Sequence, residues 1–148
     1  MTLLGVFAEW APRLCHYQSS YLSKIIAHDQ DLRETGRHPN PDAPKLCRNW
    51  PKTPWAATAF NLGPQTVCFR HADYHNLAFG WCAITALGDF DYKKGGHLVL
   101  WDLGLVFEFP AGSTILIPSA AADHSNARVN ADERRYSFTQ YTAGGIFR

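Results

Sequence analysis

The sequence predicts a mainly β protein that carries helices at its N-terminus and a double-sheet jelly roll or barrel after them. Three observations support this fold class. Apolar residues recur at helical intervals near the N-terminus, short apolar segments follow one another at roughly ten-residue spacing after Trp55, and Gly- and Pro-containing turns separate those segments. No helical period lies between the later segments, which favours packed antiparallel sheets over alternating strands and helices.

The N-terminal helix is predicted from a single apolar face. Its spacing of three and four residues continues to about His28, and Pro12 is the break that separates it from a shorter helix before it. A helix of this kind covers a larger body with its apolar side. The face consists of Leu14, Tyr17, Tyr21, Leu22, Ile25 and Ile26.

Residues 33–55 are predicted to form an extended connector, because Gly and Pro interrupt regular backbone hydrogen bonding along this stretch. It is basic, with Glu34 and Asp42 as its acidic residues, and it contains Trp50 and Trp55. Basic and aromatic side chains together are typical of a nucleic-acid contact surface, and they also occur in solvated loops. Both interpretations stay open for Arg33, Arg37, Lys45, Arg48 and Lys52.

The remainder of the chain reads as short strands between turns, which gives three expected parts. Residues 1–32 form a helical cover, residues 33–55 the connector, and residues 56–148 a β core. The strands are expected at Ala56–Leu62, Thr66–His71, Gly80–Leu87, His97–Trp101, Leu105–Phe109, Ser113–Ile117, near His124–Val129, and at Arg135–Thr142.

The charge balance excludes one class of protein. Lys and Arg number 14 against 13 Asp and Glu, so the formal net charge is +1. Proteins that bind nucleic acid through a basic tail need a much larger positive surplus. An enzyme that contacts nucleic acid through one pocket is not excluded. Hydrophobic residues make up 46% of the 148 residues, which is enough for a packed core.

The sequence also lacks two kinds of targeting segment. No apolar run approaches the roughly 20 residues that span a bilayer, and no basic N-terminal region precedes an apolar stretch as in a secretory signal. The cysteines are irregularly spaced, so we expect four buried thiols in a reducing compartment rather than a zinc site or disulfides. They are Cys15, Cys47, Cys68 and Cys82.

A metal centre is predicted where the second expected strand ends. Alternation along a strand places His71 and Asp73 on the same side. Two histidines and one carboxylate form the facial triad that holds Fe(II) and leaves positions open for oxygen and a co-substrate. The third ligand should come from a late strand, and His124 stands there.

A co-substrate anchor is expected about ten residues after His124. The carboxylate of 2-oxoglutarate that lies far from the metal needs a cation, and Arg135 with Ser137 offers a guanidinium and a hydroxyl on one side of a strand. Arg134 competes with Arg135, but adjacent residues point to opposite faces, and the Arg-x-Ser spacing favours Arg135. His97 follows a Gly-Gly turn, and it either hydrogen-bonds the co-substrate or finishes a strand.

At these residues the sequence resembles a known family. The stretch from Ala57 to Arg148 is similar to the ten-eleven translocation and J-binding protein (TET/JBP) dioxygenases, and most similar to their fungal branch. The segments that carry the resemblance are Thr58–Asn61, Gly63–Thr66, Gly95–Asp102, Pro110–Pro118, His124–Asn126 and Arg135–Tyr141.

The resemblance implies a double-stranded β-helix (jelly-roll) core that uses Fe(II), 2-oxoglutarate and O2 to oxidise the methyl group of 5-methylcytosine. The motif match gives His71, Asp73 and His124 the roles of iron ligands and catalytic residues. It gives Arg135 and Ser137 the role of the co-substrate anchor.

The iron motif continues through His75 and Asn76, which is similar to animal members in which this pair reaches the flipped base. The two residues are therefore implied substrate contacts, and the Asn76 amide can both donate and accept, as a cytosine edge requires. A turn-forming Asn at the exit of a strand is the alternative for Asn76. His97 resembles the strand histidine that contacts 2-oxoglutarate in animal enzymes.

The sequence departs from animal members in two places. Their Cys-rich zinc-binding region is absent, so contact with DNA would come from elsewhere, with Arg33–Lys52 as a candidate. Their base-contacting histidine after the Arg-x-Ser strand is missing, because that region reads Tyr141–Gly144. The chain ends at Arg148, shortly after the last expected strand, which indicates a minimal or truncated member.

We therefore expect an Fe(II)- and 2-oxoglutarate-dependent dioxygenase that oxidises a methylated nucleobase, with 5-methylcytosine in DNA as the first candidate, as in DNA demethylation. A 2-oxoglutarate-dependent hydroxylase of a protein side chain or small molecule is the alternative, and a non-catalytic β-barrel binding module is the third. The expected partners are methylated nucleic acid, DNA before RNA, and O2, without a membrane. The expected location is nuclear, otherwise cytoplasmic. The sequence does not indicate an oligomeric state.

Overall fold

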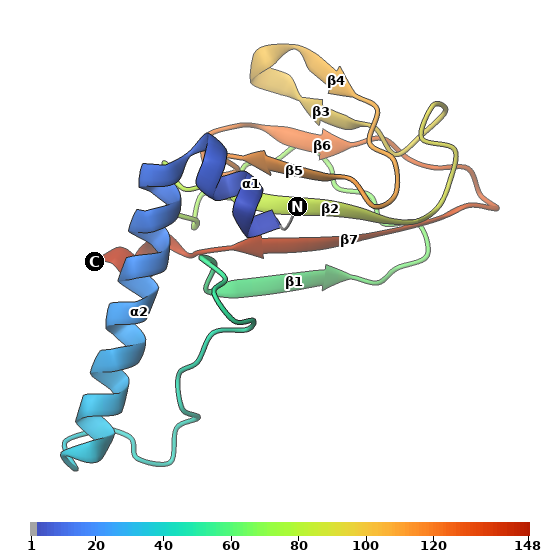
Figure 1. Cartoon of the computed structure of the whole chain (residues 1–148). Helices are drawn as coiled ribbons and strands as arrows, with labels where there is room; N and C mark the ends of the chain where they lie inside the picture. Colours follow the sequence, from blue (N-terminus) through green and yellow to red (C-terminus); the bar gives the residue numbers. More distant parts are fainter. Residues whose placement is uncertain (1–2) are drawn as a thin grey trace. The chain divides into compact units, whose positions relative to one another are not determined.

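The chain forms two compact units, each described here by itself. The computed structural model describes residues 3–148; one unit ends at Ala56 and the other runs from Ala57 to Arg148. The first contains two helices, and the strands of the described chain, β1 to β7, lie in the second (Figure 1). The protein is therefore mainly β with N-terminal helices, as the sequence predicts. Within the described residues, no helix combines the length and the apolarity that crossing a bilayer requires.

Helix α2 is longer than its apolar periodicity predicts. Helix α1 spans Leu3–Trp10 and α2 spans Pro12–Glu34. Pro12 starts α2 instead of only separating two helices, because the first turn of a helix tolerates a residue without an N–H. At the other end, the Thr35 hydroxyl donates to the Asp31 carbonyl at 2.7 Å, and Gly36 adopts a left-handed φ of 66° that ends the helix.

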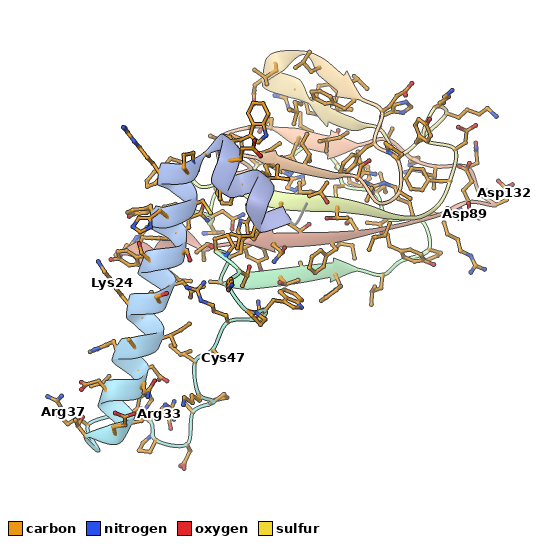
Figure 2. All side chains as sticks on the ribbon, in the orientation of Figure 1. Lys24, Arg33, Arg37, Cys47, Asp89 and Asp132 are labelled. Atoms are coloured by element: carbon orange, nitrogen blue, oxygen red, sulfur yellow. The ribbon has the colours of Figure 1, made fainter. Side chains whose placement is uncertain are left out.

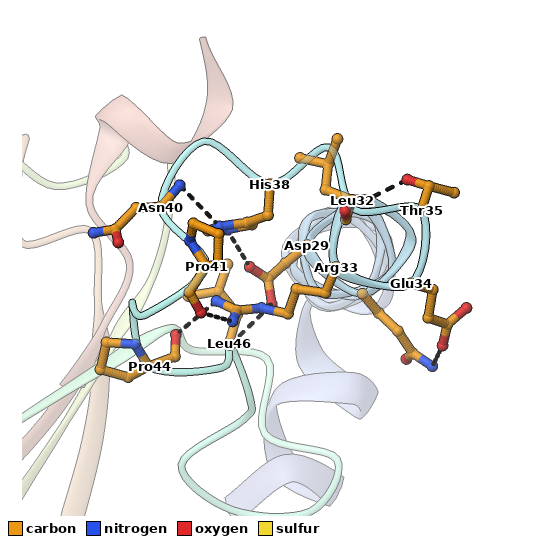
Figure 3. Close-up of polar contacts among 11 residues, drawn as sticks. Asp29, Leu32, Arg33, Glu34, Thr35, His38, Asn40, Pro41, Pro44 and Leu46 are labelled. Atoms are coloured by element: carbon orange, nitrogen blue, oxygen red, sulfur yellow. Dashed lines mark hydrogen bonds and ion pairs between the residues drawn. The ribbon is translucent and has the colours of Figure 1, made fainter.

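The connector folds back onto the C-terminal part of α2. The Arg33 guanidinium bonds the Asp29 carboxylate at 3.0 Å and the carbonyls of Pro41 and Pro44 at 3.2 and 3.3 Å (Figure 3). His38 reaches the same carboxylate, with 3.1 Å between Nε2 and Oδ1. One buried acidic residue on the helix thus organises the first half of the loop.

A second arginine fixes the other half of the connector. Arg48 donates through Nη2 to the Ser19 carbonyl at 2.8 Å and to the Ser23 hydroxyl at 2.6 Å, and through Nη1 to the Thr53 carbonyl. Arg37 forms an ion pair with Asp31 near the end of α2; Figure 2 labels Arg37 and Arg33 at this end of the helix. Three of the five basic residues considered for a nucleic-acid surface therefore have structural partners within their own unit.

The cysteines are free thiols, and they differ in exposure. Cys15 and Cys82 are buried as expected, whereas Cys68 is half-buried and Cys47 is exposed. The expectation of four buried thiols is wrong for Cys47, because the connector that carries it lies on the surface of its unit (Figure 2).

The second unit consists of two antiparallel sheets. One has the strand order β1-β7-β2-β5 and the other the order β4-β3-β6. The strands are β1 (Ala57–Asn61), β2 (Cys82–Asp89), β3 (Leu98–Leu100), β4 (Leu105–Phe107), β5 (Thr114–Ile117), β6 (His124–Asn126) and β7 (Arg134–Tyr141).

Strand β7 is central to the larger sheet, because it pairs with both β1 and β2. At Gly88 the backbones of β2 and β7 lie close together. It has a φ of 124°, and a Cβ built there would lie 2.1 Å from the Arg134 carbonyl oxygen. Only glycine fits this position, so β2 continues through the predicted turn to Asp89.

The predicted strand at Thr66–His71 does not form a regular ladder. Instead, isolated bridges hold its two ends to different sheets: Gln65, just before it, bridges to Arg135 of β7, and His71 bridges to His124 of β6. Its backbone bonds are satisfied by two different neighbours, so neither pairing grows long enough to make a strand. The segment spans from one sheet to the other.

One hydrophobic cluster joins the two sheets. Ala86 of β2 and Ile117 of β5 pack with Leu98 and Leu100 of β3 and with Phe109. All five side chains are at most 6% exposed. Side chains alternate along β3, so Leu98 and Leu100 point inward and Val99, between them, points to the other face.

Candidate metal centre and cavity

Three side chains converge at the junction of the two sheets. The candidate ligand atoms of His71, Asp73 and His124 all lie within 4.8 Å of one another. Nε2 of His71 is 3.6 Å from Oδ1 of Asp73, and the two imidazole rings have centroids 4.4 Å apart. Two imidazoles and one carboxylate at this separation could hold a single transition-metal ion.

The backbone sets this geometry. The N–H of His71 donates to the carbonyl of His124 at 3.1 Å, and the N–H of His124 donates back at 2.8 Å. The N–H of Asp73 donates to the carbonyl of Ser119 at 2.8 Å. Each of the three residues is thus fixed by its main chain as well as by its side chain.

Both imidazoles make a hydrogen bond through Nδ1, which leaves Nε2 as the atom available to a metal. Nδ1 of His71 lies 2.7 Å from the Phe69 carbonyl, and Nδ1 of His124 lies 2.9 Å from the Ala122 carbonyl. A carbonyl oxygen accepts but cannot donate, so each Nδ1 carries a proton, and in a neutral imidazole with this hydrogen bond Nε2 has the lone pair that can bind a metal. Such bonds from the second ring nitrogen are usual for metal-ligating histidines.

The carboxylate of Asp73 has its own supporting contacts. Nδ2 of Asn76 donates to Oδ2 of Asp73 at 3.3 Å, and it also lies 3.3 Å from Oγ of Ser119 and 3.5 Å from Sγ of Cys82. The Ser119 hydroxyl donates to Cys82 at 2.9 Å. Burial raises the pKa of the Cys82 thiol to about 11, more than these hydrogen bonds lower it. Cys82 therefore acts here as a neutral packing partner.

An ion pair connects the two histidine-bearing segments on their outer side. Arg70, which precedes His71, bonds Oδ2 of Asp123, which precedes His124, at 2.7 Å. The guanidinium also lies 5.3 Å from the ring centroid of Trp101. Because the pair is partly exposed, its contribution to stability is small, of the order of 0.2–1 kcal/mol. The pair joins the two segments whose main chain positions His71 and His124.

A cavity of about 520 Å³ adjoins the three side chains within the second unit. Alternate residues of β7 line it together with the three candidate ligand residues, and Leu98 of β3 contributes apolar surface. A volume in this range is typical of sites for small ligands. The β7 residues are Arg135, Ser137, Thr139 and Tyr141.

Arg135 is the buried cation of this cavity. It is 2% exposed, and Nη1 donates to the Thr66 carbonyl at 3.2 Å. Among residues 3–148 no carboxylate forms an ion pair with it, and its buried Nε has no hydrogen-bond partner there. Burial lowers the pKa of the Arg135 guanidinium, although the group stays charged. Arg134, its competitor in the sequence, is exposed and does not line the cavity.

Ser137 lies two residues after Arg135 on the same side of β7, and it is 5% exposed. Nδ2 of Asn61, on the neighbouring strand β1, donates to its hydroxyl oxygen at 2.8 Å. Asn61 also lines the cavity, and no sequence pattern had singled it out for a role at the site. Its position follows from the register that pairs Asn61 with Ser137.

The structure places the remaining expected residues differently from one another. His75 lines the cavity and is exposed, so it is accessible to a ligand there. Asn76 lines it as well, but its amide nitrogen donates to Asp73 and Ser119. His97 is not among the lining residues, because its neighbour Leu98 takes the inward position at the start of β3. The structure therefore does not bring His97 to the expected co-substrate site.

Comparisons with known proteins bear on the fold. No family model matches the sequence, and no curated protein matches it. A solved structure that is similar to it is "NgTET1 in complex with 5mC DNA", with a TM-score of 0.54 and 20% sequence identity. The alignment covers 64% of this chain and 36% of that one, so this chain spans little more than a third of the length of NgTET1. At this identity the likeness establishes a shared fold.

Proposed function

We propose that the protein is an Fe(II)- and 2-oxoglutarate-dependent dioxygenase that oxidises the methyl group of a methylated nucleobase, with 5-methylcytosine in DNA as its substrate. One observation carries the proposal. A single cavity has three potential metal ligands, His71, Asp73 and His124, and a buried guanidinium, Arg135, without a carboxylate partner among the described residues.

The fold assigned to this function is a double-stranded β-helix, or jelly roll, formed by residues 57–148. Its support is the pair of antiparallel sheets that share one hydrophobic cluster. The similarity to the fold of NgTET1 also supports it. The cavity then lies between the sheets, where barrels and jelly rolls commonly bind ligands.

The donor set of the metal site fits Fe(II). Two neutral imidazoles and one carboxylate are the ligands of non-heme iron oxygenases, which need open coordination positions. The hydrogen bonds from Nδ1 of His71 and His124 hold both lone pairs ready for the ion. When bound, the iron would supply the coupled reduction of O2 and oxidative decarboxylation of 2-oxoglutarate.

The co-substrate also needs a site for its far carboxylate, and Arg135 provides the positive charge for it. Burying a guanidinium without a counter-charge costs several kcal/mol, and a carboxylate ligand would offset this cost. The far carboxylate of 2-oxoglutarate suits the bidentate fork of Arg135 and the hydroxyl of Ser137. A cavity of about 520 Å³ has room for this small dicarboxylate and for part of a substrate.

The nucleobase is the finer part of the proposal. NgTET1 was solved with 5mC DNA, and its similar fold supports a substrate of the same class. A base in duplex DNA would have to leave its stack to reach the cavity, which costs a few kcal/mol. The exposed His75 at the cavity offers a ring nitrogen to such a base. A nuclear location belongs to the same proposal.

One observation favours the alternative, a 2-oxoglutarate-dependent hydroxylase of a protein side chain or small molecule. The connector was the candidate for DNA contact. However, the guanidinium groups of Arg33 and Arg48 donate hydrogen bonds to carbonyls, a carboxylate and hydroxyls of their own unit. With a formal net charge of +1, the chain has little general attraction for phosphates. This alternative retains the same metal and co-substrate site.

The test is turnover by the purified protein with Fe(II), ascorbate and 2-oxoglutarate. Matched duplexes with 5-methylcytosine or cytosine at the same position would be supplied, and both succinate and the nucleosides would be measured by mass spectrometry. The proposal predicts 5-hydroxymethylcytosine in the methylated duplex, and none with the His71→Ala variant. His28→Ala is the matched control, because it removes an exposed histidine that does not line the cavity.

The outcomes separate the candidates. Succinate release without any change in the base, and its stimulation by a protein or small-molecule extract, would favour the hydroxylase and overturn the nucleobase assignment. An absence of succinate in every arm, with wild-type protein that is folded, would overturn the dioxygenase assignment itself.

A further inference from the structure

Asn61 lies at the cavity, directly opposite Ser137. The two residues are Cα partners in the antiparallel register of β1 and β7, and both line the cavity. Nδ2 of Asn61 lies 2.8 Å from Oγ of Ser137, which is a short bond for a neutral amide and hydroxyl. Asn61 is the last residue of β1, at the edge of its sheet.

This bond determines what the Ser137 hydroxyl can do. An amide nitrogen donates and cannot accept, so Oγ of Ser137 must be the acceptor in this pair. The hydroxyl proton then stays free, and the described residues contain no acceptor bonded to it. Since Ser137 is 5% exposed and faces the cavity, its O–H is available to a ligand there.

The neighbouring cation specifies the kind of ligand. Arg135 is on the same face of β7, two residues before Ser137, and both line the cavity. A hydroxyl that only donates and a guanidinium form one anion-binding pair. An Asn that fixes the direction of the hydroxyl improves this pair without contacting the anion itself.

We propose that Asn61 is a positioning residue for 2-oxoglutarate, which holds the Ser137 hydroxyl as a donor to the carboxylate at C5. The inference rests on the proposed function, because it takes 2-oxoglutarate as the ligand of Arg135. It adds a residue on β1 that the iron and anchor motifs do not contain.

A purely structural role for the Asn61 side chain has less support. The strand is already held to β7 by five paired positions. Packing between the strands comes from Phe60 and Phe138, whose ring centroids are 5.0 Å apart. Phe60 is adjacent to Asn61, so its side chain points to the opposite side of the strand. Loss of the amide should therefore leave β1 in place.

The test measures binding by calorimetry, with Mn(II) in place of Fe(II) so that no turnover occurs. We expect Ser137→Ala to weaken 2-oxoglutarate binding about tenfold and Asn61→Ala to weaken it about threefold, as for hydrogen bonds to a charged group. The double variant should bind no more weakly than Ser137→Ala alone, because Asn61 acts through Ser137. Asn61→Asp should weaken binding about a hundredfold, because its carboxylate would accept the Ser137 proton and repel the ligand.

Two controls separate this role from general damage. Leu62→Asp introduces the same charge one residue later, at a side chain that is 74% exposed and does not line the cavity, and it should leave binding unchanged. The second control is 2-oxobutanoate, which lacks the C5 carboxylate. Its affinity should not change in Asn61→Ala, and neither should the affinity for Mn(II).

The results that would overturn the inference differ from those that would overturn the proposed function. Additive losses in the double variant, or an equal loss for 2-oxobutanoate, would show that Asn61 does not act through Ser137 on the C5 carboxylate. Unchanged binding in Asn61→Asp would overturn it as well. Failure of the wild-type protein to bind 2-oxoglutarate at all would instead contradict the co-substrate assignment.

Discussion

His71 and His124 exchange backbone hydrogen bonds, of 3.1 and 2.8 Å, so their imidazoles leave the main chain from directly opposed positions. The ring centroids are consequently 4.4 Å apart. The two residues are distant in the sequence, and this single bridge turns them into one site. The distance between the two candidate ligands is therefore a property of the backbone and not of two flexible side chains.

Removing either imidazole should abolish metal binding without unfolding the protein. We expect His124→Ala to lower the affinity for Mn(II) by at least about a hundredfold, because only two of the three protein ligands would remain. Calorimetric titration with Mn(II), together with circular dichroism, would measure both properties. His28→Ala removes an exposed histidine of α2 and serves as the control. Equal affinities of His124→Ala and wild type would refute the metal centre.

Asn76 should affect the metal more than the substrate. Its amide supports Oδ2 of Asp73 at 3.3 Å, so Asn76→Ala should weaken Mn(II) binding about tenfold, as for other partners of metal ligands. His75→Ala is the matched variant, because His75 lines the same cavity without a bond to Asp73 among the described contacts. If Asn76 instead reads a base, its replacement would raise the KM for the methylated duplex and leave the affinity for Mn(II) unchanged.

The order of elements could be predicted from the sequence, because strand alternation and turn residues are local properties. The segment 66–71 shows where this reasoning ends. Its alternation is that of a strand, but Gln65, the residue before it, bridges to β7 and His71 bridges to β6, so no ladder forms. Pairing depends on which neighbour the folded chain supplies. Helix α2 also exceeds its apolar periodicity, because Pro12 starts it and the helix continues past His28 to Glu34, shortly before Gly36.

The candidate site was predictable as far as it depends on residue type and strand face. His71, Asp73, His124, Arg135 and Ser137 do line one cavity. The contacts that support them come from other elements and do not follow from residue type or strand face, as with Asn61 on β1 and Ser119 before β6. His97, for which the sequence left open a co-substrate contact or the end of a strand, does not line the cavity, because the next residue, Leu98, is the inward one.

Arg135 should decrease the stability of the free protein while it serves the ligand. Replacing this buried and unpaired guanidinium with an apolar side chain of similar size, Arg135→Met, should raise the free energy of unfolding by about 1 to 4 kcal/mol and remove 2-oxoglutarate binding. Denaturant titration with and without 2-oxoglutarate would measure both effects. Arg134→Met is the control on the exposed face of the same strand. A large loss of stability in Arg135→Met would indicate a structural arginine instead.

The four thiols should differ sharply in reactivity at neutral pH. Cys47 is exposed and should react rapidly with a disulfide reagent in the native protein. Cys82 is 2% exposed, and burial raises its pKa to about 11, so almost no thiolate is present there. Cys15 is also buried, and Cys68 is intermediate. We expect one fast-reacting thiol in the native wild-type protein and none in native Cys47→Ser. In denaturant all four thiols of the wild type should react. A fast thiol that persists in that variant would contradict the assigned burial.

The acid stability of the first unit should depend on Asp29, a buried carboxylate near the end of α2. The hydrogen bond from Arg33 is the main reason that the pKa of Asp29 is lowered, and Leu46 and His38 act in the same direction. A lowered pKa means that the folded state binds its proton less readily than the unfolded state does. The stabilisation is then complete above the ordinary Asp pKa of about 3.9, and it is lost as the pH falls through the lower, folded value.

Asp29→Asn should therefore destabilise the protein at pH 7 and lose this effect in acid. Helicity at 222 nm, followed during denaturant titration between pH 7 and pH 2, would give the difference in unfolding free energy between the two proteins. We expect this difference to be constant down to about pH 4 and to shrink below it. Asp31→Asn is the matched variant, because Asp31 contacts Arg37 at the exposed surface of the same helix. A difference that stayed constant to pH 2 would mean that Asp29 stabilises α2 by packing and not through its charge.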